Sequence, residues 1–134
     1  MCYSSDDILV LHCPESLSIR QKVSAIQDMP DWLANETNKT HNYVMTWLST
    51  NPNDSSSRLR PDREKTKKNV VVEQYDLGFY RDKGYELHVE CEFTQSSASI
   101  SKKIPDDYKY CDISYKKHSG LNTENRVFCR KNKN

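Results

Sequence analysis

Residues 70–95 read VVVEQYDLGFYRDKGYELHVECEFTQ, and this stretch decides the expected fold. Two runs of alternating apolar and polar residues flank the triplet Asp82-Lys83-Gly84. Alternation with a period of two is typical of strands. A three-residue hairpin loop favours a left-handed residue at its end, and glycine adopts that conformation without strain. The stretch therefore predicts a β-hairpin that turns at this triplet.

The register of the hairpin follows from keeping its two faces distinct, because a slip of one residue exchanges the faces. Pairing Arg81 with Tyr85 separates apolar from polar side chains. The expected apolar pairs are Phe79/Leu87, Leu77/Val89 and Tyr75/Cys91. The expected polar pairs are Tyr80/Glu86, Gly78/His88, Asp76/Glu90 and Gln74/Glu92. One face should thus be buried while the other carries a row of acids.

The segments around the hairpin predict further strands and two helices. Strands are expected at 8–11, at 108–117 (with Cys111, Ile113 and Tyr115 on one side) and at 126–130. Roughly helical spacing of apolar residues predicts helices over 15–29 and about 40–49, and Trp32 and Leu33 should close the bottom of the same core. The expected fold class is α+β, with an N-terminal strand and two helices packed on one face of a three- to four-stranded antiparallel sheet.

The chain of 134 residues has the length of a single domain. Residues 50–68 are almost free of apolar side chains and predict a mobile polar loop. No apolar run approaches the length of a membrane span, and the N-terminal residues do not resemble a signal peptide. We therefore expect an intracellular soluble protein if the chain is complete, and a secreted one if a signal peptide was removed. The composition, rich in Lys, Asn and Ser, suits an AT-rich genome such as that of a virus or a parasite.

The five cysteines show no metal-binding or redox spacing, and we predict reduced, mostly buried thiols. The chain has only three glycines, so a glycine-rich phosphate loop is not expected, and no cofactor is predicted.

Charges are sorted along the chain although the net charge is only +1. Residues 58–68 hold six basic and two acidic side chains, whereas residues 73–92 hold six acidic and two basic ones. The basic C-terminal tail, at about 126–134, holds four basic side chains and no acid. This sorting favours a small, non-enzymatic interaction module that binds a protein partner through a charge-segregated surface. The expected binding residues are Arg58, Arg60, Arg63, Lys65, Asp76, Glu86, His88, Glu90 and Glu92.

Two alternatives remain open. The acidic hairpin face could hold Mg²⁺ or Mn²⁺ through Asp76, Glu90 and Glu92, with basic loop residues clamping phosphate oxygens, as a phosphate-ester or triphosphate hydrolase would need. The basic loop and the basic tail could instead bind nucleic acid in a salt-dependent way. No interaction with a membrane is expected.

Overall fold

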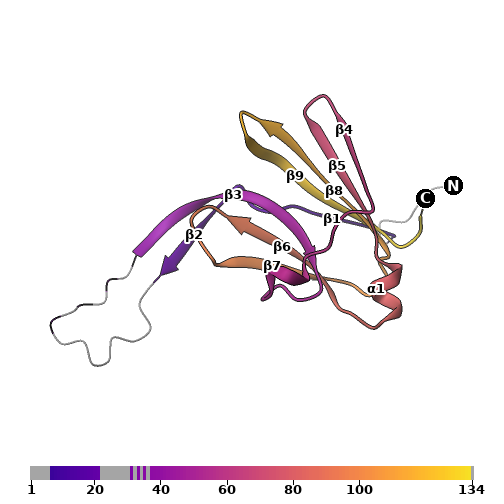
Figure 1. Cartoon of the computed structure of the whole chain (residues 1–134), viewed down its shortest axis with the longest axis horizontal. Helices are drawn as coiled ribbons and strands as arrows, with labels where there is room; N and C mark the ends of the chain where they lie inside the picture. Colours follow the sequence, from indigo (N-terminus) through magenta and orange to yellow (C-terminus); the bar gives the residue numbers. More distant parts are fainter. Residues whose placement is uncertain (1–6, 22–30, 32, 34, 36, 134) are drawn as a thin grey trace.

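The computed structural model describes residues 7–21, 31, 33, 35 and 37–133. Within this part the chain is nearly all β, with two antiparallel sheets and one short α-helix (Figure 1). The first sheet has, in spatial order, β1 (Ile8–Leu11), β9 (Leu121–Arg130), β8 (Tyr110–His118), β5 (Val70–Asp76) and β4 (Arg63–Lys67). The second has β2 (Ser16–Gln21), β3 (Thr37–Ser49), β6 (Leu87–Phe93) and β7 (Ser99–Ile104).

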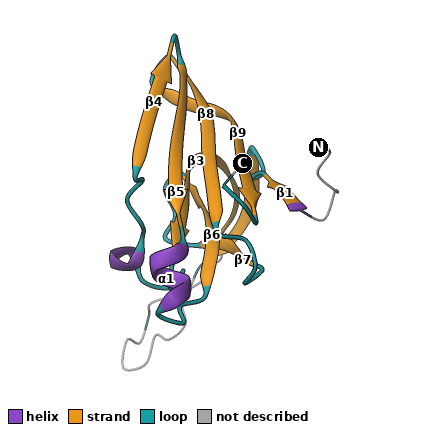
Figure 2. Ribbon diagram, turned by 90° about the vertical axis from the view of Figure 1, so that its right-hand side faces the viewer, coloured by secondary structure: helices purple, strands orange, loops and turns teal. Residues whose placement is uncertain are grey.

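The expected α+β fold with two helices is therefore wrong. The segment at 40–49 is part of β3, and the described beginning of 15–29 is β2, while residues 22–30 lie outside the described residues. The sole described α-helix, α1 (Gly78–Asp82), has five residues and follows β5 (Figure 2). Leu33 does not close a core, because 83% of its surface is exposed, and Trp32 lies outside the described residues.

A β-bulge explains why β3 resembles a helix in the sequence. The buried residues of β3 include Tyr43, Thr46 and Leu48, and the pairing of β3 with β6 shifts between Tyr43 and Met45. A bulge adds one residue to a strand, so the inward side chains are spaced by three residues across it instead of two. That spacing imitates one turn of an amphipathic helix.

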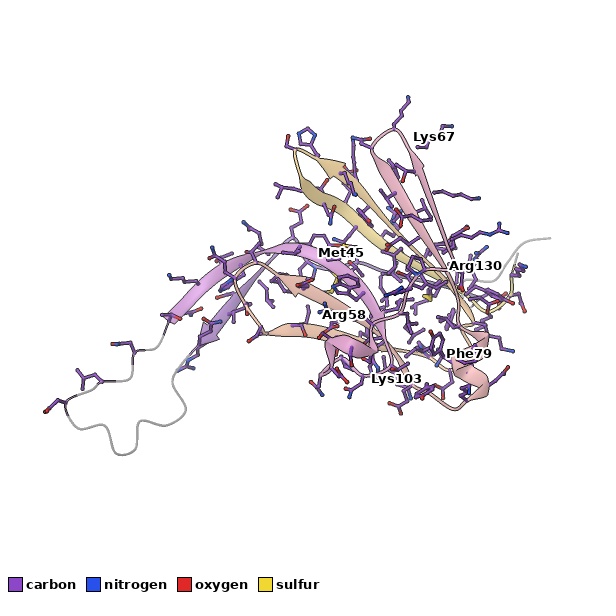
Figure 3. All side chains as sticks on the ribbon, viewed as in Figure 1. Met45, Arg58, Lys67, Phe79, Lys103 and Arg130 are labelled. Carbon is purple, nitrogen blue, oxygen red and sulfur yellow. A yellow bond between two sulfur atoms is a disulfide. The ribbon has the colours of Figure 1, made fainter. Side chains whose placement is uncertain are left out.

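The predicted hairpin is also wrong, because its two strands lie in different sheets. β5 pairs with β4 and β8, and β6 pairs with β3 and β7. In the segment between β5 and β6, the Leu77 N–H donates to the Lys109 carbonyl oxygen at 2.7 Å, and α1 then connects the first sheet to the second. Phe79, expected on the buried face, is 63% exposed and labelled in Figure 3. The apolar sides of β5 and β6 do meet, but as opposing layers of a sandwich.

The core between the sheets is built from both layers. Its fully buried members include Leu48, Leu87 and Ile104 from the four-stranded sheet and Ile113 and Val127 from the five-stranded one. The sheets approach each other near α1 and diverge toward the opposite end (Figure 1). The outer face of each sheet is therefore left for solvent or for a partner.

The strands expected at 8–11, 108–117 and 126–130 are confirmed, with the last as the end of the longer β9. The polar segment 50–68 is not one open loop. It contains a 3-10 turn at Ser55–Ser57 and the strand β4, and Leu59 is buried, with its N–H donating to the Leu48 carbonyl oxygen at 2.8 Å.

Four cysteines form disulfides, so the prediction of reduced thiols is wrong for them. Cys13, which follows β1, is bonded to Cys91 on β6, and Cys111 on β8 is bonded to Cys129 on β9. Long-range pairing of this kind has no local sequence signal. None of the described helices is long and apolar enough to span a membrane.

Candidate protein-binding surface

Basic side chains gather on the outer face of the five-stranded sheet. The register aligns Lys65, Val72, Ser114 and Arg126 in one row across β4, β5, β8 and β9. Residues two positions apart on a strand share a face, so neighbouring rows add their cations to the same side. We call this surface the basic face, and its cations are Arg63, Lys65, Lys67, Lys116, Arg126, Arg130 and the adjacent Lys133.

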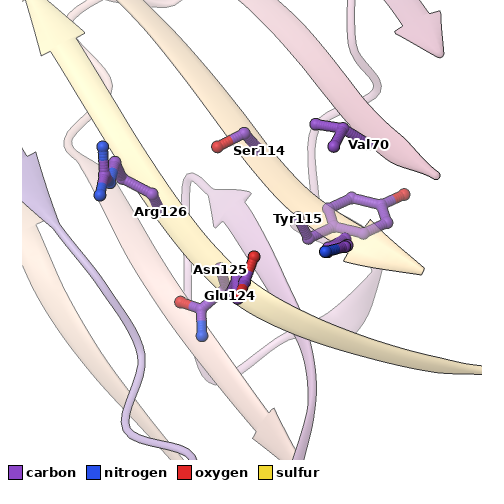
Figure 4. Close-up of a pocket in the computed structure, with 7 residues that line it drawn as sticks. Val70, Ser114, Tyr115, Glu124, Asn125 and Arg126 are labelled. Carbon is purple, nitrogen blue, oxygen red and sulfur yellow. The ribbon is translucent and has the colours of Figure 1, made fainter. Parts of the chain in front are cut away.

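Two hollows lie on the basic face. One of about 480 Å³ is lined by residues that include Arg63, Lys65, Tyr110 and Arg130. The other, of about 450 Å³, is lined by Val70, Ser114, Tyr115, Lys116, Glu124, Asn125 and Arg126 (Figure 4). The face is thus uneven enough to receive protruding side chains of another molecule.

The basic face also carries acids, which its seven cations outnumber: Asp62, Asp76 and Asp112 line the larger hollow, and Glu124 lines the other. The Arg130 Nη2 atom lies 3.8 Å from the Asp112 Oδ2 atom, whereas no ion pair joins Lys65, Lys67 or Arg126 to another described residue. Asp76, an expected binding residue, lies on this sheet and accepts a hydrogen bond from the Gly78 N–H at 2.9 Å. The basic face therefore keeps an excess of positive charge.

The acidic residues of β6 lie on the outer face of the other sheet, where they are already paired. Glu90 is 3% exposed, and its Oε1 atom lies 3.2 Å from the Arg58 Nε atom. The Arg58 guanidinium carbon also lies 4.6 Å from the ring centroid of Trp47, whose Nε1–H donates to the Glu92 Oε1 atom at 2.9 Å. Ser99 donates to the second oxygen of Glu90 at 3.1 Å. The carboxylates of this polar network thus already have a cation of the same chain, Arg58, as their partner.

The remaining expected residues do not assemble into a metal site. Glu86 is exposed and lies 3.4 Å from the Lys103 Nζ atom, and Arg60 is exposed. His88 is half-buried, with a buried Nδ1 atom that has no hydrogen-bond partner in the described structure. Asp76 lies in a different sheet from Glu90 and Glu92. No cluster of three potential metal ligands is found among the described residues.

A buried carboxyl group, that of Glu73, points from β5 toward the interior. Its residue is 7% exposed, and the Tyr75 hydroxyl donates to its Oε1 atom at 3.4 Å. Burial is the main cause that raises the pKa of Glu73 above its ordinary value of 4.5, and the neighbouring Glu64 on β4 raises it further. The folded state therefore binds the proton of Glu73 more tightly than the unfolded chain does.

We predict that Glu73→Gln raises the melting temperature at pH 7 by a few degrees. Because the folded-state pKa exceeds the unfolded one, ionised Glu73 lowers stability, and this cost sets in as the pH rises past the unfolded value and is complete above the folded one. Thermal melts from pH 4 to pH 8 should show a gain that disappears toward pH 4. Glu15→Gln, at an exposed carboxyl, is the control. A gain equally large at pH 4 would contradict this explanation.

The basic face combines two segments that the sequence presents separately, the basic loop and the basic tail. Of its cations, Arg63 and Lys65 were expected as protein-binding residues. The basic loop and the basic tail were joined only in the nucleic-acid alternative, and Lys116 was in neither expectation. One signal could have found the basic face, since the cations of 63–67 occur at every second residue, which is the spacing of one face of a strand.

No curated protein and no solved structure matches the chain. One family model, described as "Type VI secretion system Tli immunity protein", matches residues 37–130, which is more than two thirds of the chain. Nothing in these comparisons supports the expected viral or parasite origin. The chain belongs to the type VI secretion system Tli immunity protein family, whose members bind a partner protein, the effector.

Proposed function

We propose that this protein neutralises its effector by binding it through the basic face, without catalysing a reaction. One observation carries the proposal: cations from segments far apart in the sequence, on β4, β8 and β9, share one exposed sheet face on which they outnumber the acids. The acidic face of the other sheet is a weaker candidate, because Glu90 and Glu92 already interact with Arg58 and Trp47.

Charge complementarity defines the partner surface. An excess of positive charge favours an acidic surface on the effector, since opposite potentials speed the encounter and suppress binding of wrong partners. The two hollows make Arg63, Lys65 and Arg126 accessible to side chains of the effector, although each hollow is also lined by acids. Arginine suits such contacts because its planar guanidinium binds carboxylates through two hydrogen bonds.

The test uses the type VI effector whose toxicity is suppressed when this protein is co-expressed. The double variant Lys65→Glu/Arg126→Glu should lower the association rate constant by about tenfold or more, because steered association depends on charge. Added salt should slow the wild-type protein but hardly affect the variant. The control is Lys39→Glu/Lys83→Glu, which makes the same change in net charge at exposed positions off the basic face.

Equal binding by the wild type and the basic-face variant would contradict the proposal. If the variant kept its affinity for the effector but lost salt-dependent binding to a DNA duplex, the basic face would be a nucleic-acid site instead.

The two disulfides support an oxidising compartment as the place where the protein acts, because disulfides persist mainly outside reducing cytosol. This agrees with the secreted alternative. Protein isolated under thiol-blocking conditions should therefore have both bonds formed.

A further inference from the structure

The outer edge of β1 differs from the other sheet edges. β1 reads Ile-Leu-Val-Leu and pairs only with β9 among the described strands. Edge strands usually carry charges that discourage pairing with other chains. The other three edges do so, with Lys65 on β4, Lys102 on β7 and Arg20 on β2. β1 is thus the uncharged edge of the described sheets.

The backbone of β1 has hydrogen-bonding groups directed at this edge. The Lys131 N–H donates to the Asp7 carbonyl oxygen at 3.4 Å. Leu9 and Cys129, which pair two positions further along, are therefore also a hydrogen-bonded pair. In an antiparallel pair, alternate residues bond to the partner, so the N–H and C=O groups of Val10 point away from β9. The side chain of Val10 lies on the outer face, and the residue is 52% exposed. A strand placed beside β1 would find these groups available.

An apolar hollow lies next to the same edge, between β1 and β7. It has a volume of about 170 Å³ and is lined by Leu11, His12, Pro14, Val89, Cys91, Ile100, Ser101 and Lys102. Ile100, on the edge strand of the second sheet, is 38% exposed although it lies on the same side of β7 as the buried Ile104. The two sheets therefore leave a seam between their edges that can receive an apolar side chain.

We propose that an extended segment of the effector pairs with β1 as an additional strand and places one apolar side chain in this hollow. In such strand addition the main-chain hydrogen bonds supply affinity, and a pocket for alternate side chains supplies specificity. The observations favour an extended segment over a helix, because an edge strand offers backbone groups in the spacing of another strand. This inference rests on the proposed function for the identity of the partner, but uses a different surface.

The test removes the outward N–H group while keeping the ladder to β9. Val10→Pro removes that donor, and proline is tolerated on edge strands where the N–H faces outward. The matched control Val10→Thr keeps the N–H at the same position. With the effector of the toxicity assay, Val10→Pro should weaken binding about tenfold, while Val10→Thr stays near wild type. Ile100→Asn, which puts an amide into the hollow, should also weaken binding.

The outcomes separate the two proposals. If Val10→Pro binds as tightly as wild type while Lys65→Glu/Arg126→Glu does not, strand addition is wrong and the proposed function stands. Equal weakening by Val10→Thr would mean a side-chain contact, and it would also overturn strand addition. A dimer of the protein alone that Val10→Pro dissociates would assign the edge to a second copy. If wild-type protein binds no effector, both proposals fail. Melting temperatures within a few degrees of wild type show that the variants are folded.

Discussion

Replacing Cys13 and Cys91 together by alanine should lower the free energy of unfolding by about 4 kcal/mol, the largest effect that we expect from any pair of substitutions. This disulfide joins residues that are 78 positions apart. A cross-link restricts the unfolded chain more strongly when it closes a longer loop. It also fastens the segment after β1 to the centre of the second sheet, so its removal should loosen the contact between the sheets.

Urea unfolding of the oxidised protein and of the variant measures this loss, which corresponds to a fall of roughly 15 °C in melting temperature. The Cys111/Cys129 pair is the internal comparison, because it spans only 18 positions and joins neighbouring strands of one sheet. Its replacement should cost about 3 kcal/mol. If the shorter cross-link proved the more important one, loop closure would not explain the stabilisation.

Arg81→Ala should lower the free energy of unfolding by about 3 kcal/mol, since it removes three hydrogen bonds from a charged donor, two of them to partly buried carbonyl groups. The Arg81 side chain is 8% exposed. Its guanidinium donates to the carbonyl oxygens of Tyr108 at 3.2 Å, Ile104 at 3.3 Å and Pro105 at 2.9 Å. These bonds attach α1 to the connection between β7 and β8.

The conservative variant tests this role of Arg81. Lysine has a single ammonium group and cannot reproduce the fork of donors, so Arg81→Lys should recover only part of the lost stability. Lys83→Ala, two positions away and exposed, should change the unfolding free energy by less than about 0.5 kcal/mol. Full recovery by lysine would show that charge alone matters at this position.

The success of sequence reasoning depended on whether the alternation of a strand was interrupted. β8 could be predicted because Cys111, Ile113 and Tyr115 alternate without interruption and are all buried. β3 could not, because its bulge and the buried Thr46 hide the period of two. The Thr46 hydroxyl is hydrogen-bonded to the Tyr43 hydroxyl at 2.7 Å, a contact within β3 that the hydropathy pattern does not reveal.

The site was harder to predict than the strands. Both basic segments were visible in the sequence, but only strand pairing brings Lys65 and Arg126 to one face. The acids of β6 suggested a metal cation, and in the structure Glu90 and Glu92 lie beside the Arg58 guanidinium. The alternation of apolar and polar residues predicts the two faces of a single strand. It does not predict which strands pair with one another, because that depends on the tertiary fold.

The pairing of β1 with β9 also determines when folding can finish. Ile8 pairs with Arg130, so β1 cannot pair with β9 until β9 has been synthesised. Until then an uncharged apolar strand has no neighbour and can associate with other nascent chains. Because contacts between residues far apart in the sequence form slowly, we expect this pairing to be a late step of folding. A translocation machinery or chaperone that shields β1 would therefore raise the yield of native protein more than one that assists the hairpin of β4 and β5 at the other edge of the sheet.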